Sequence, residues 1–297
     1  MSSTQHVRSH LRKNEWEAYL FILPLVAIVG VLIVYSIILM GANSFYKVDI
    51  TFTRGEFVGL KYYKAALQDK HLYRAILNTL VFAGGSVIFG LSIGFLFSVF
   101  LSFSFRGVRF FRTLFFVPTL LPNAMIAAIF GGMLRYRFGT LNDFLKLFGI
   151  PAVRWLSDPT LAYFSVLMIG VYMIGIPMMY YQAELATSDR AMYEAAMIDG
   201  AGFWTITGRI IFPSVMHSHK TITMTLMLTA FRAFERVYLL TDGGPGRATE
   251  ITGTYLYTFF TEGAANNIGF VNAVSVLILL LAFLLSVVIL KAFTLKT

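Results

Sequence analysis

The chain has 297 residues, of which 57% are hydrophobic and only 13% are charged, whereas soluble domains carry roughly 25% charged residues. This composition argues against a cytosolic enzyme. The chain has no cysteine, which excludes disulfides, thiolate metal sites and a cysteine nucleophile. The net charge of +9 would suggest nucleic acid for a soluble chain. Here Lys and Arg lie mostly between apolar runs, so we expect a lipid bilayer and no nucleic-acid partner.

Long uncharged segments recur along the chain. Five of them contain no Lys, Arg, Asp or Glu: residues 18–46, 75–105, 113–134, 159–183 and 263–290. Each exceeds the ~20 apolar residues that cross a bilayer. A sixth apolar stretch, residues 221–240, is long enough to span but contains Arg232, Glu235 and Arg236. The sequence therefore predicts six membrane spans.

The spans are predicted to be helices because lipid offers no partner to unpaired backbone groups, and the alternation of a barrel strand is absent. The fold class is all-α, a polytopic membrane protein. The expected helices cover residues 19–40, 76–103, 113–133, 162–182, 222–240 and 268–290. Four prolines inside these spans predict kinks: Pro24, Pro118, Pro122 and Pro177.

The N-terminus combines a basic prelude with a first apolar run too long for a signal peptide and without a cleavage site. We expect residues 1–17 to form a cytoplasmic tail and residues 18–297 to form one six-helix domain. The count of basic residues on the two sides is nearly even and does not decide the orientation. The cluster of Arg106, Arg109 and Arg112 in a very short connection favours a cytoplasmic N-terminus.

The connection after the third span contains an amphipathic segment. From Leu141 to Phe148 the apolar residues have helical spacing and the polar residues lie on the opposite face; Gly149 is expected to end the segment. We expect a short helix that lies along the membrane surface or caps the bundle.

The segment 184–220 is too polar for the bilayer and too patterned for a loop. A helix is expected from Asp189, capped by Ser188 or Asp189, with Gly200 supplying the positive φ that ends it. A second helical piece, residues 203–211, is expected to end before Pro213. The small side chains of Ala195 and Ala196 would let another protein approach the helix backbone closely. The alternative is a cytoplasmic hairpin that only covers the bundle, since alanine is simply the best helix former.

The stretch from Tyr193 to Ala201, with Pro213 downstream, resembles the EAA-G coupling motif of permease subunits of bacterial ATP-binding-cassette (ABC) importers. The sugar-permease branch, of the maltose-uptake type, is the most similar. Three further stretches resemble that branch in the same order: residues 138–142, 155–159, and 240–245 with Thr249 and Glu250. Met197 and Gly202 depart from the pattern, since the family commonly has a basic and a small polar residue there.

This resemblance implies a non-enzymatic subunit that moves a sugar, expected to be a di- or oligosaccharide, across the bacterial cytoplasmic membrane. The chain has no G-x-x-x-x-G-K-[ST] phosphate loop, so it binds no cofactor itself, and ATP and Mg²⁺ belong to partner ATPases. The implied partners are two ATPase copies, a second homologous permease and an extracytoplasmic solute-binding protein. The resemblance assigns the ATPase contact to Tyr193, Glu194, Ala195, Ala196, Asp199, Gly200, Ala201 and Pro213.

A polar stripe marks the fifth span. Thr221, Thr225, Thr229, Arg232 and Arg236 have spacings that predict one helical face. An arginine at bilayer depth costs ~2.5–3.5 kcal/mol on insertion scales, so this face should meet protein or water. Glu235 is placed to pair with Arg232. The face either lines a sugar path or bonds to another subunit. Candidates for the path also include Phe231, Phe234 and Tyr238. Asn78 and Asn272 are further polar candidates, but each is expected to make a structural bond.

Two other classes remain to be weighed. A self-sufficient secondary transporter or channel would need buried ionisable residues on several helices and inverted repeats, neither of which the sequence shows. An intramembrane serine protease is disfavoured because the histidines fall outside the spans and no G-x-S-x-G elbow is present. His217 and His219 could suggest a metal-binding pair. Two residues apart on a helix, however, they would point away from one another, so we expect them in a hydrated loop instead.

Overall fold

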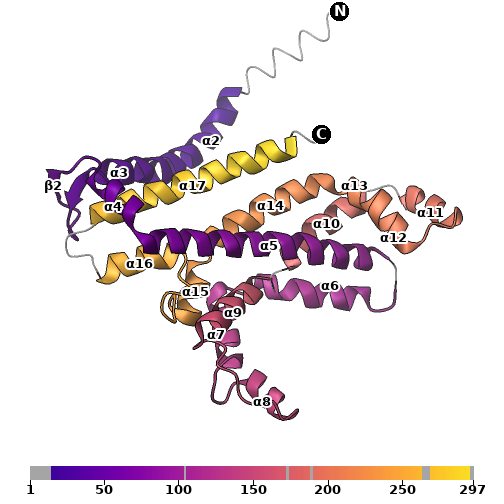
Figure 1. Ribbon diagram of the computed structural model, residues 1–297. Coiled ribbons are helices and arrows are strands. Elements are labelled where there is room, and N and C mark those ends of the chain that lie inside the picture. The colour runs from indigo at the N-terminus through magenta and orange to yellow at the C-terminus, as the bar shows by residue number, and fades with distance from the viewer. Residues whose placement is uncertain (1–14, 104, 172–173, 188–189, 263–267, 295–297) are drawn as a thin grey trace, which may run out of the picture. The chain divides into compact units, whose positions relative to one another are not determined.

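The computed structural model describes residues 15–103, 105–171, 174–187, 190–262 and 268–294. The all-α class is confirmed, with one short β-hairpin added. The chain, drawn in Figure 1, divides by its internal contacts into two compact units. The first combines Met1–Leu67 with Phe259–Leu277, and the second combines Gln68–Thr258 with Ile278–Thr297. Each unit is described by itself.

The first unit begins with one long helical stretch, made of α2 (Glu15–Val29), the π-helical turn η1 (Gly30–Tyr35) and α3 (Ser36–Asn43). Within its apolar segment Ala18–Asn43, an 18-residue window contains no buried residue, which fits a helix that faces lipid. The predicted first span is thus confirmed as a helix. The hairpin that follows, β1 (Tyr46–Val48) and β2 (Arg54–Phe57), was not predicted.

The remainder of the first unit contains α4 (Lys61–Gln68), the end of α16 (Thr252–Glu262) and the first part of α17 (Ile268–Thr294). The antiparallel strands bring the rings of Tyr46 and Phe57 to 5.2 Å between centroids. A Cβ added to Gly269 would lie 2.2 Å from the Tyr46 carbonyl oxygen. Only glycine therefore lets α17 pass this close to the hairpin.

The second unit is organised around α5 (Lys70–Ser102), a helix of 33 residues and thus about 50 Å long. Gly90, Gly94 and Ser98 recur every four residues on one face of α5. A Cβ on Gly90 would lie 2.5 Å from Leu226, and one on Gly94 would lie 2.6 Å from Pro177. The Ser98 hydroxyl donates to the Met178 carbonyl at 3.1 Å. Small residues thus allow close helix packing, as is common in membranes.

The other elements of the second unit follow in chain order: α6 (Val108–Phe116), the 3₁₀ turn η2 (Val117–Leu120), α7 (Asn123–Met133), α8 (Thr140–Lys146), α9 (Pro159–Val171), α10 (Gly175–Thr187), α11 (Arg190–Ile198), α12 (Phe203–Ile206), the π-helical η3 (Thr207–Ile211), α13 (Phe212–Ser214), α14 (Met216–Phe231) and α15 (Phe234–Thr241). Helices α10 and α14 pack along α5. In Figure 1, α11 to α13 lie towards one end of α5, and α15 lies towards the other end.

The predicted spans are only partly reproduced as straight helices. By length and composition, four helical stretches among the described residues are able to cross a membrane, or five if the bent pair Val108–Leu120 and Asn123–Met133 is one span. The expected helix 113–133 is therefore corrected to two pieces with a 104° bend. Leu121 at the bend is extended, because the following Pro122 disfavours a helical conformation in the residue before it.

Candidate functional site

The predicted helix of segment 184–220 is α11, and Gly200 ends it as expected. The expected capping residues Ser188 and Asp189 lie outside the described residues. Gly200 has φ +79°, and its N–H donates to the Met197 carbonyl at 3.1 Å. The Ala201 N–H donates to the Ala196 carbonyl at 2.9 Å. These two bonds form a Schellman motif, which requires a left-handed residue at this position.

Helix α11 has two distinct faces. Tyr193 and Ala196, three residues apart, are half-buried and pack with Ala201 against a buried cluster. Glu194 and Ala195 are exposed, as are Asp199 and Gly200 further along. The coupling residues named by the resemblance therefore divide into an inner set that fixes the helix and an outer set that is free to meet a partner.

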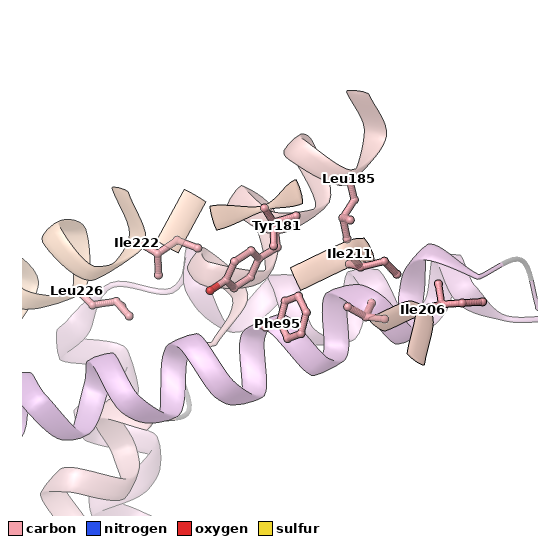
Figure 2. Packing of buried hydrophobic residues seen from close by; sticks show 9 residues of the cluster. Phe95, Tyr181, Leu185, Ile206, Ile211, Ile222 and Leu226 are labelled. Atoms are coloured by element: carbon pink, nitrogen blue, oxygen red, sulfur yellow. The ribbon is translucent and has the colours of Figure 1, made fainter. Parts of the chain in front are cut away.

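The buried cluster under α11 is drawn from four parts of the chain (Figure 2). Phe95 and Val99 come from α5, Tyr181 and Leu185 from α10, and Ile222 and Leu226 from α14. Ile206 and Ile211 belong to the segment that follows α11. One apolar cluster therefore joins α5, α10 and α14 to the described part of segment 184–220, which is called the coupling segment below.

The second helical piece does not end before Pro213, which corrects that prediction. Helical backbone continues from Phe203 through the π-helical η3 and α13 to Ser214, and Pro213 is exposed on it. Pro213 lies in the first turn of α13, a position where the missing N–H of proline removes little hydrogen bonding.

Glu184, at the start of the segment, joins its two ends. Its carboxylate accepts a hydrogen bond from the Ser218 backbone N–H at 3.0 Å and one from the Ser218 hydroxyl. These bonds hold α10 and α14 together beside the coupling segment, because Glu184 and Ser218 are 34 residues apart in sequence.

The expected hydrated loop at His219 is wrong. His219 is 8% exposed on α14, and its ring lies 4.9 Å from that of Phe212 and 5.1 Å from that of Tyr181, centroid to centroid. Its Nδ1 lies 2.9 Å from the Val215 carbonyl oxygen. The prediction failed because the aromatic neighbours come from α10 and α13, which are distant or irregular in sequence. His217 is exposed.

The polar stripe of the fifth span does not form one helical face. Helix α14 ends at Phe231, and Arg232 and Ala233 have ψ near 0°, so that α15 starts in a new direction. Arg232 is exposed, whereas Arg236 is buried. The bend brings Phe234 against Gly253, where an added Cβ would lie 2.8 Å from the Phe234 Cβ.

The individual candidates for the sugar path have different surroundings. Thr225 and Thr229 are half-buried, and the Thr229 hydroxyl donates to the Thr225 carbonyl at 2.8 Å within the helix. Phe231 is half-buried at the end of α14. Glu235 is exposed and forms no ion pair with Arg232, because the helix that would align them is interrupted.

Three aromatic rings lie close together after the bend between α14 and α15. Phe234 and Tyr238 stack at 5.4 Å, and Tyr257 of α16 lies 5.3 Å from Phe234 and 4.8 Å from Tyr238. Sequence reasoning selected the first two and missed Tyr257. No local pattern pointed to Tyr257, because its place depends on how α16 returns to α15.

The two asparagine candidates are separated. Asn78 is 6% exposed and its amide donates to the Ala248 and Glu250 carbonyls at 3.1 and 2.9 Å. The amide nitrogen of Asn78 therefore holds a loop, as expected for a structural bond. Asn272 is half-buried in α17 and belongs to the first unit.

The loop that Asn78 holds is the glycine-rich motif after α15. Asp242 and Gly243 have φ +51° and +77°, and the Thr249 hydroxyl donates to the Gly244 carbonyl at 2.8 Å. Glu250 is 3% exposed. Burial raises the pKa of its carboxyl above the ordinary value of 4.5, and Arg247, 3.5 Å away, opposes that rise.

The remaining two motifs also meet inside the structure. Asn142, 0% exposed on α8, donates to the carbonyls of Arg135, Tyr136 and Val153 at 3.2, 3.2 and 2.9 Å. Its side-chain oxygen accepts from the Val153 N–H and from Trp155 Nε1, both at 3.0 Å. We call these five residues the Asn142 hub. The expected amphipathic helix is confirmed as α8.

No protein-family model matches the chain. It is 29% identical over 290 residues to the probable ABC transporter permease protein YurN of Bacillus subtilis, covering 95% of this chain and 98% of that protein. It is also 29% identical to the trehalose/maltose transport system permease protein MalF of Thermococcus litoralis, covering 92% of each. The diacetylchitobiose uptake permease DasB of Streptomyces coelicolor is 26% identical, over 92% of this chain and 85% of that protein.

A solved structure has the same fold. A chain of a bacterial ABC transporter involved in alginate import superposes with a TM-score of 0.83 at 19% identity, covering 98% of this chain and 99% of that one. The sequence relatives confirm the predicted resemblance to permease subunits of ABC transporters, among them sugar permeases.

Proposed function

We propose that this chain is the permease subunit of an importer that moves a sugar, a di- or oligosaccharide, through the cytoplasmic membrane with energy from separate ATPase subunits. The observation that carries the proposal is the two-faced helix α11, whose inner residues share a core with the bundle while its outer residues are exposed. The names of the relatives, which include trehalose/maltose and diacetylchitobiose permeases, support a sugar as the cargo.

The outer face of the coupling segment has the character of a docking surface. Ile198 is 86% exposed and Trp204 is 72% exposed, and they accompany the exposed small residue Ala195 and the carboxylate of Glu194. Burying such apolar side chains against a partner contributes roughly 1.5–3 kcal/mol each. We assign this surface to the ATPase, which binds the ATP and Mg²⁺.

The mechanism requires a stiff connection. Reversing a bundle from 1:99 to 99:1 between inward-open and outward-open states takes about 5.5 kcal/mol of differential stabilisation. The shared core of α5, α10, α14 and the coupling segment, together with the Glu184–Ser218 bonds, supplies such a connection. We propose that ATPase closure moves the docked α11 and that this core transmits the motion.

The two ends of α5 indicate how the chain is oriented in the membrane. The coupling segment packs near Phe95 and Val99, and the glycine-rich loop binds Asn78 near the opposite end. Because α5 is long enough to span the bilayer, we place the coupling segment and the N-terminus in the cytoplasm and the loop outside. The loop would then face a solute-binding protein; a chain of the same fold belongs to a bacterial alginate transporter that was solved in complex with a periplasmic protein.

The sugar path is assigned to the inner part of α14 and to the bend that follows it. Thr225 and Thr229 offer hydroxyl groups, and Arg232 is an exposed donor beside Phe231. The rings of Phe234 and Tyr238 offer apolar faces to a sugar ring. Arg232→Ala is expected to change the apparent KM for uptake more than the maximal rate, and unchanged kinetics would instead favour a contact between subunits.

Purification and reconstitution test the proposal. The tagged chain should co-purify with two ATPase copies and a second, homologous permease, and liposomes containing the complex should take up sugar only with ATP and the binding protein. The chain alone should hydrolyse no ATP. Uptake by the chain alone, driven by an ion gradient, would instead establish a secondary transporter.

A further inference from the structure

Helix α8, in the connection between α7 and α9, has apolar side chains on two sides. On one side, Leu141 packs against the buried cluster that α7, α9 and α15 share. On the other side, Phe144, Leu147 and Phe148 are 55%, 80% and 67% exposed, and the two phenylalanine rings lie 5.2 Å apart, centroid to centroid. We call these three residues the α8 face. The helix therefore caps the bundle with one side only, and the α8 face is left exposed.

Phe138, two residues before α8, is a further exposed apolar side chain. It is 90% exposed and has φ +62°, a left-handed conformation that bulky residues rarely adopt. The turn around it is tight, because a Cβ added to Gly139 would overlap the Arg135 carbonyl oxygen, and Asn142 donates to that same carbonyl at 3.2 Å. The chain thus holds an exposed ring in an unfavourable conformation, and such conformations cluster at functional positions.

The Asn142 hub ties α8 to the ends of two membrane helices. The Asn142 amide binds the Arg135 and Tyr136 carbonyls, which follow α7 closely. Its oxygen accepts from Trp155 Nε1, four residues before Pro159, where a helical stretch able to cross a membrane begins. In Figure 1, α8 lies beyond the end of α7 and away from α5. Because a spanning helix ends where the bilayer ends, the hub holds α8 near the membrane surface.

The charges of this connection favour an anionic surface. Residues 134–158 contain two carboxylates and four basic side chains: Arg135, Arg137, Lys146 and Arg154. Asp143 pairs with Lys146, and Asp158 accepts hydrogen bonds from the first backbone N–H groups of α9. The three arginines are exposed and form no ion pair among the described residues. Exposed apolar side chains combined with unpaired basic ones are typical of a segment that lies in the interface of an anionic membrane.

We propose that the α8 face and Phe138 are inserted into the bilayer surface, and that the neighbouring arginines bind the phosphates of anionic lipids. Arginine suits this position because its aliphatic stem lies on apolar groups while its guanidinium reaches the phosphate. The connection between α7 and α9 is thereby anchored to the membrane. The proposal depends neither on the cargo nor on the ATPase, and variants of this surface should leave ATPase binding unchanged.

A spin label measures the insertion directly. The chain has no cysteine, so Leu147→Cys provides a unique labelling position in the full-length chain. The labelled chain is placed in nanodiscs of phosphatidylcholine with a minor share of phosphatidylglycerol. Its nitroxide is expected about 5–10 Å below the phosphates, where it collides more with oxygen than with a water-soluble nickel chelate. Leu23→Cys on the exposed apolar helix α2 is the control for lipid, and Ile198→Cys on the outer face of α11 is the control for water.

A second variant tests the ring of Phe138. Phe138→Gly removes the ring and keeps the turn, because glycine adopts a positive φ readily, so the label on Leu147→Cys should move towards water. The matched control is Phe52→Gly. Phe52 has φ +59° and is 62% exposed, but it lies in the hairpin of the first unit, so its loss should not move the label. Equal effects of the two variants would contradict the role of Phe138.

The role of charge is tested with Arg137→Gln. A fluorophore on Leu147→Cys is quenched by spin-labelled phosphatidylglycerol or phosphatidylcholine, and the ratio reports which lipid surrounds α8. One basic residue near an anionic surface changes lipid affinity about fivefold, so the preference for phosphatidylglycerol should fall by up to that factor. Arg209→Gln, at an exposed arginine of η3, should keep the wild-type preference. An unchanged preference in Arg137→Gln would overturn the binding of lipid phosphates.

The insertion itself is refuted if the nickel chelate reaches the label on Leu147→Cys as readily as the label on Ile198→Cys. It is also refuted if the label becomes shielded only after a second permease or a solute-binding protein is added, because the α8 face would then be a protein interface. Phe148→Cys offers the same measurement from a second exposed position, so that a folding defect in one variant does not decide the result.

Discussion

The coupling segment and the Asn142 hub differ in where their polar groups find partners. Both contain stretches that resemble the same permease branch. At the hub, the amide of Asn142 makes five hydrogen bonds, all within the chain. On the outer face of α11, Glu194, Asp199 and the large side chain of Ile198 are exposed. A motif that satisfies itself specifies the fold, and a motif that leaves its groups outside specifies a partner.

The largest effect is expected from breaking the hub. Asn142→Ala leaves the Trp155 ring N–H, the Val153 N–H and three carbonyls without their partner. At about 1–3 kcal/mol for each buried group left unsatisfied, a loss of ~3 kcal/mol or more is expected. The measurement is the unfolding midpoint in detergent together with the amount of inserted protein.

The control for the hub is its neighbour Asp143. This residue is exposed and pairs only with Lys146 at 2.9 Å, so Asp143→Ala should change stability by less than about 0.5 kcal/mol. An Asn142→Ala protein as stable as the wild type would contradict the division between the two regions.

The next largest effect is expected at Gly200, and it should be functional. A Cβ at Gly200 meets nothing within 4 Å, so only its φ of +79° resists a side chain. The left-handed conformation costs about 1–2 kcal/mol, and 1.4 kcal/mol corresponds to about a tenfold change in rate. Gly200→Val should therefore lower uptake roughly fivefold to thirtyfold while the chain remains inserted.

Two variants sharpen this result. Gly202 also has open space around it but has φ −73°, so Gly202→Ala should transport normally. Asparagine tolerates the left-handed region better than valine, so Gly200→Asn should recover part of the uptake. Normal uptake by Gly200→Val would refute the coupling role of this turn.

The same contrast explains what the sequence could predict. Gly200 and Gly149 end helices where expected, with φ of +79° and +73°, because a turn depends on a few adjacent residues. The apolar runs predicted membrane helices for a similar reason, because each run consists of consecutive residues. Features that depend on distant partners were missed, among them the burial of His219 and the contact of Tyr257 with Phe234.

The fifth span shows why periodicity has limits. The prediction that Thr225, Thr229 and Arg232 share one face holds only for an uninterrupted helix. The helix is interrupted at Arg232 and Ala233, so the predicted face does not form. Neither residue is glycine or proline, so nothing local marks the bend. Its stabilising contact is with Gly253 of α16, twenty residues further along. Only tertiary packing determines it.

A smaller effect is expected on the outer face of α11. Ile198→Asp places a charge on a side chain that is 86% exposed in the free chain, so the unfolding midpoint should not change. A buried unpaired charge and the lost apolar contact should weaken ATPase binding at least about tenfold. The control is Leu147→Asp, at the end of α8 and 80% exposed, which should bind the ATPase normally. Equal binding by both variants would remove the outer face from the interface.

The smallest effect is a pH trend at Glu250, the one carboxylate that the glycine-rich loop buries beside Arg247. Burial raises the pKa of Glu250 in the folded chain above 4.5, so the folded state binds the proton more tightly than the unfolded state. Its contribution to stability is therefore complete below pH 4.5 and is lost as the pH rises through the folded-state pKa. Glu250→Gln stays neutral and should lose less stability than the wild type between pH 4.5 and 8, measured by unfolding midpoints. Asp143→Asn, at an exposed site, should follow the wild-type trend. If Glu250→Gln follows it as well, the burial of the Glu250 carboxyl has no energetic consequence for the loop.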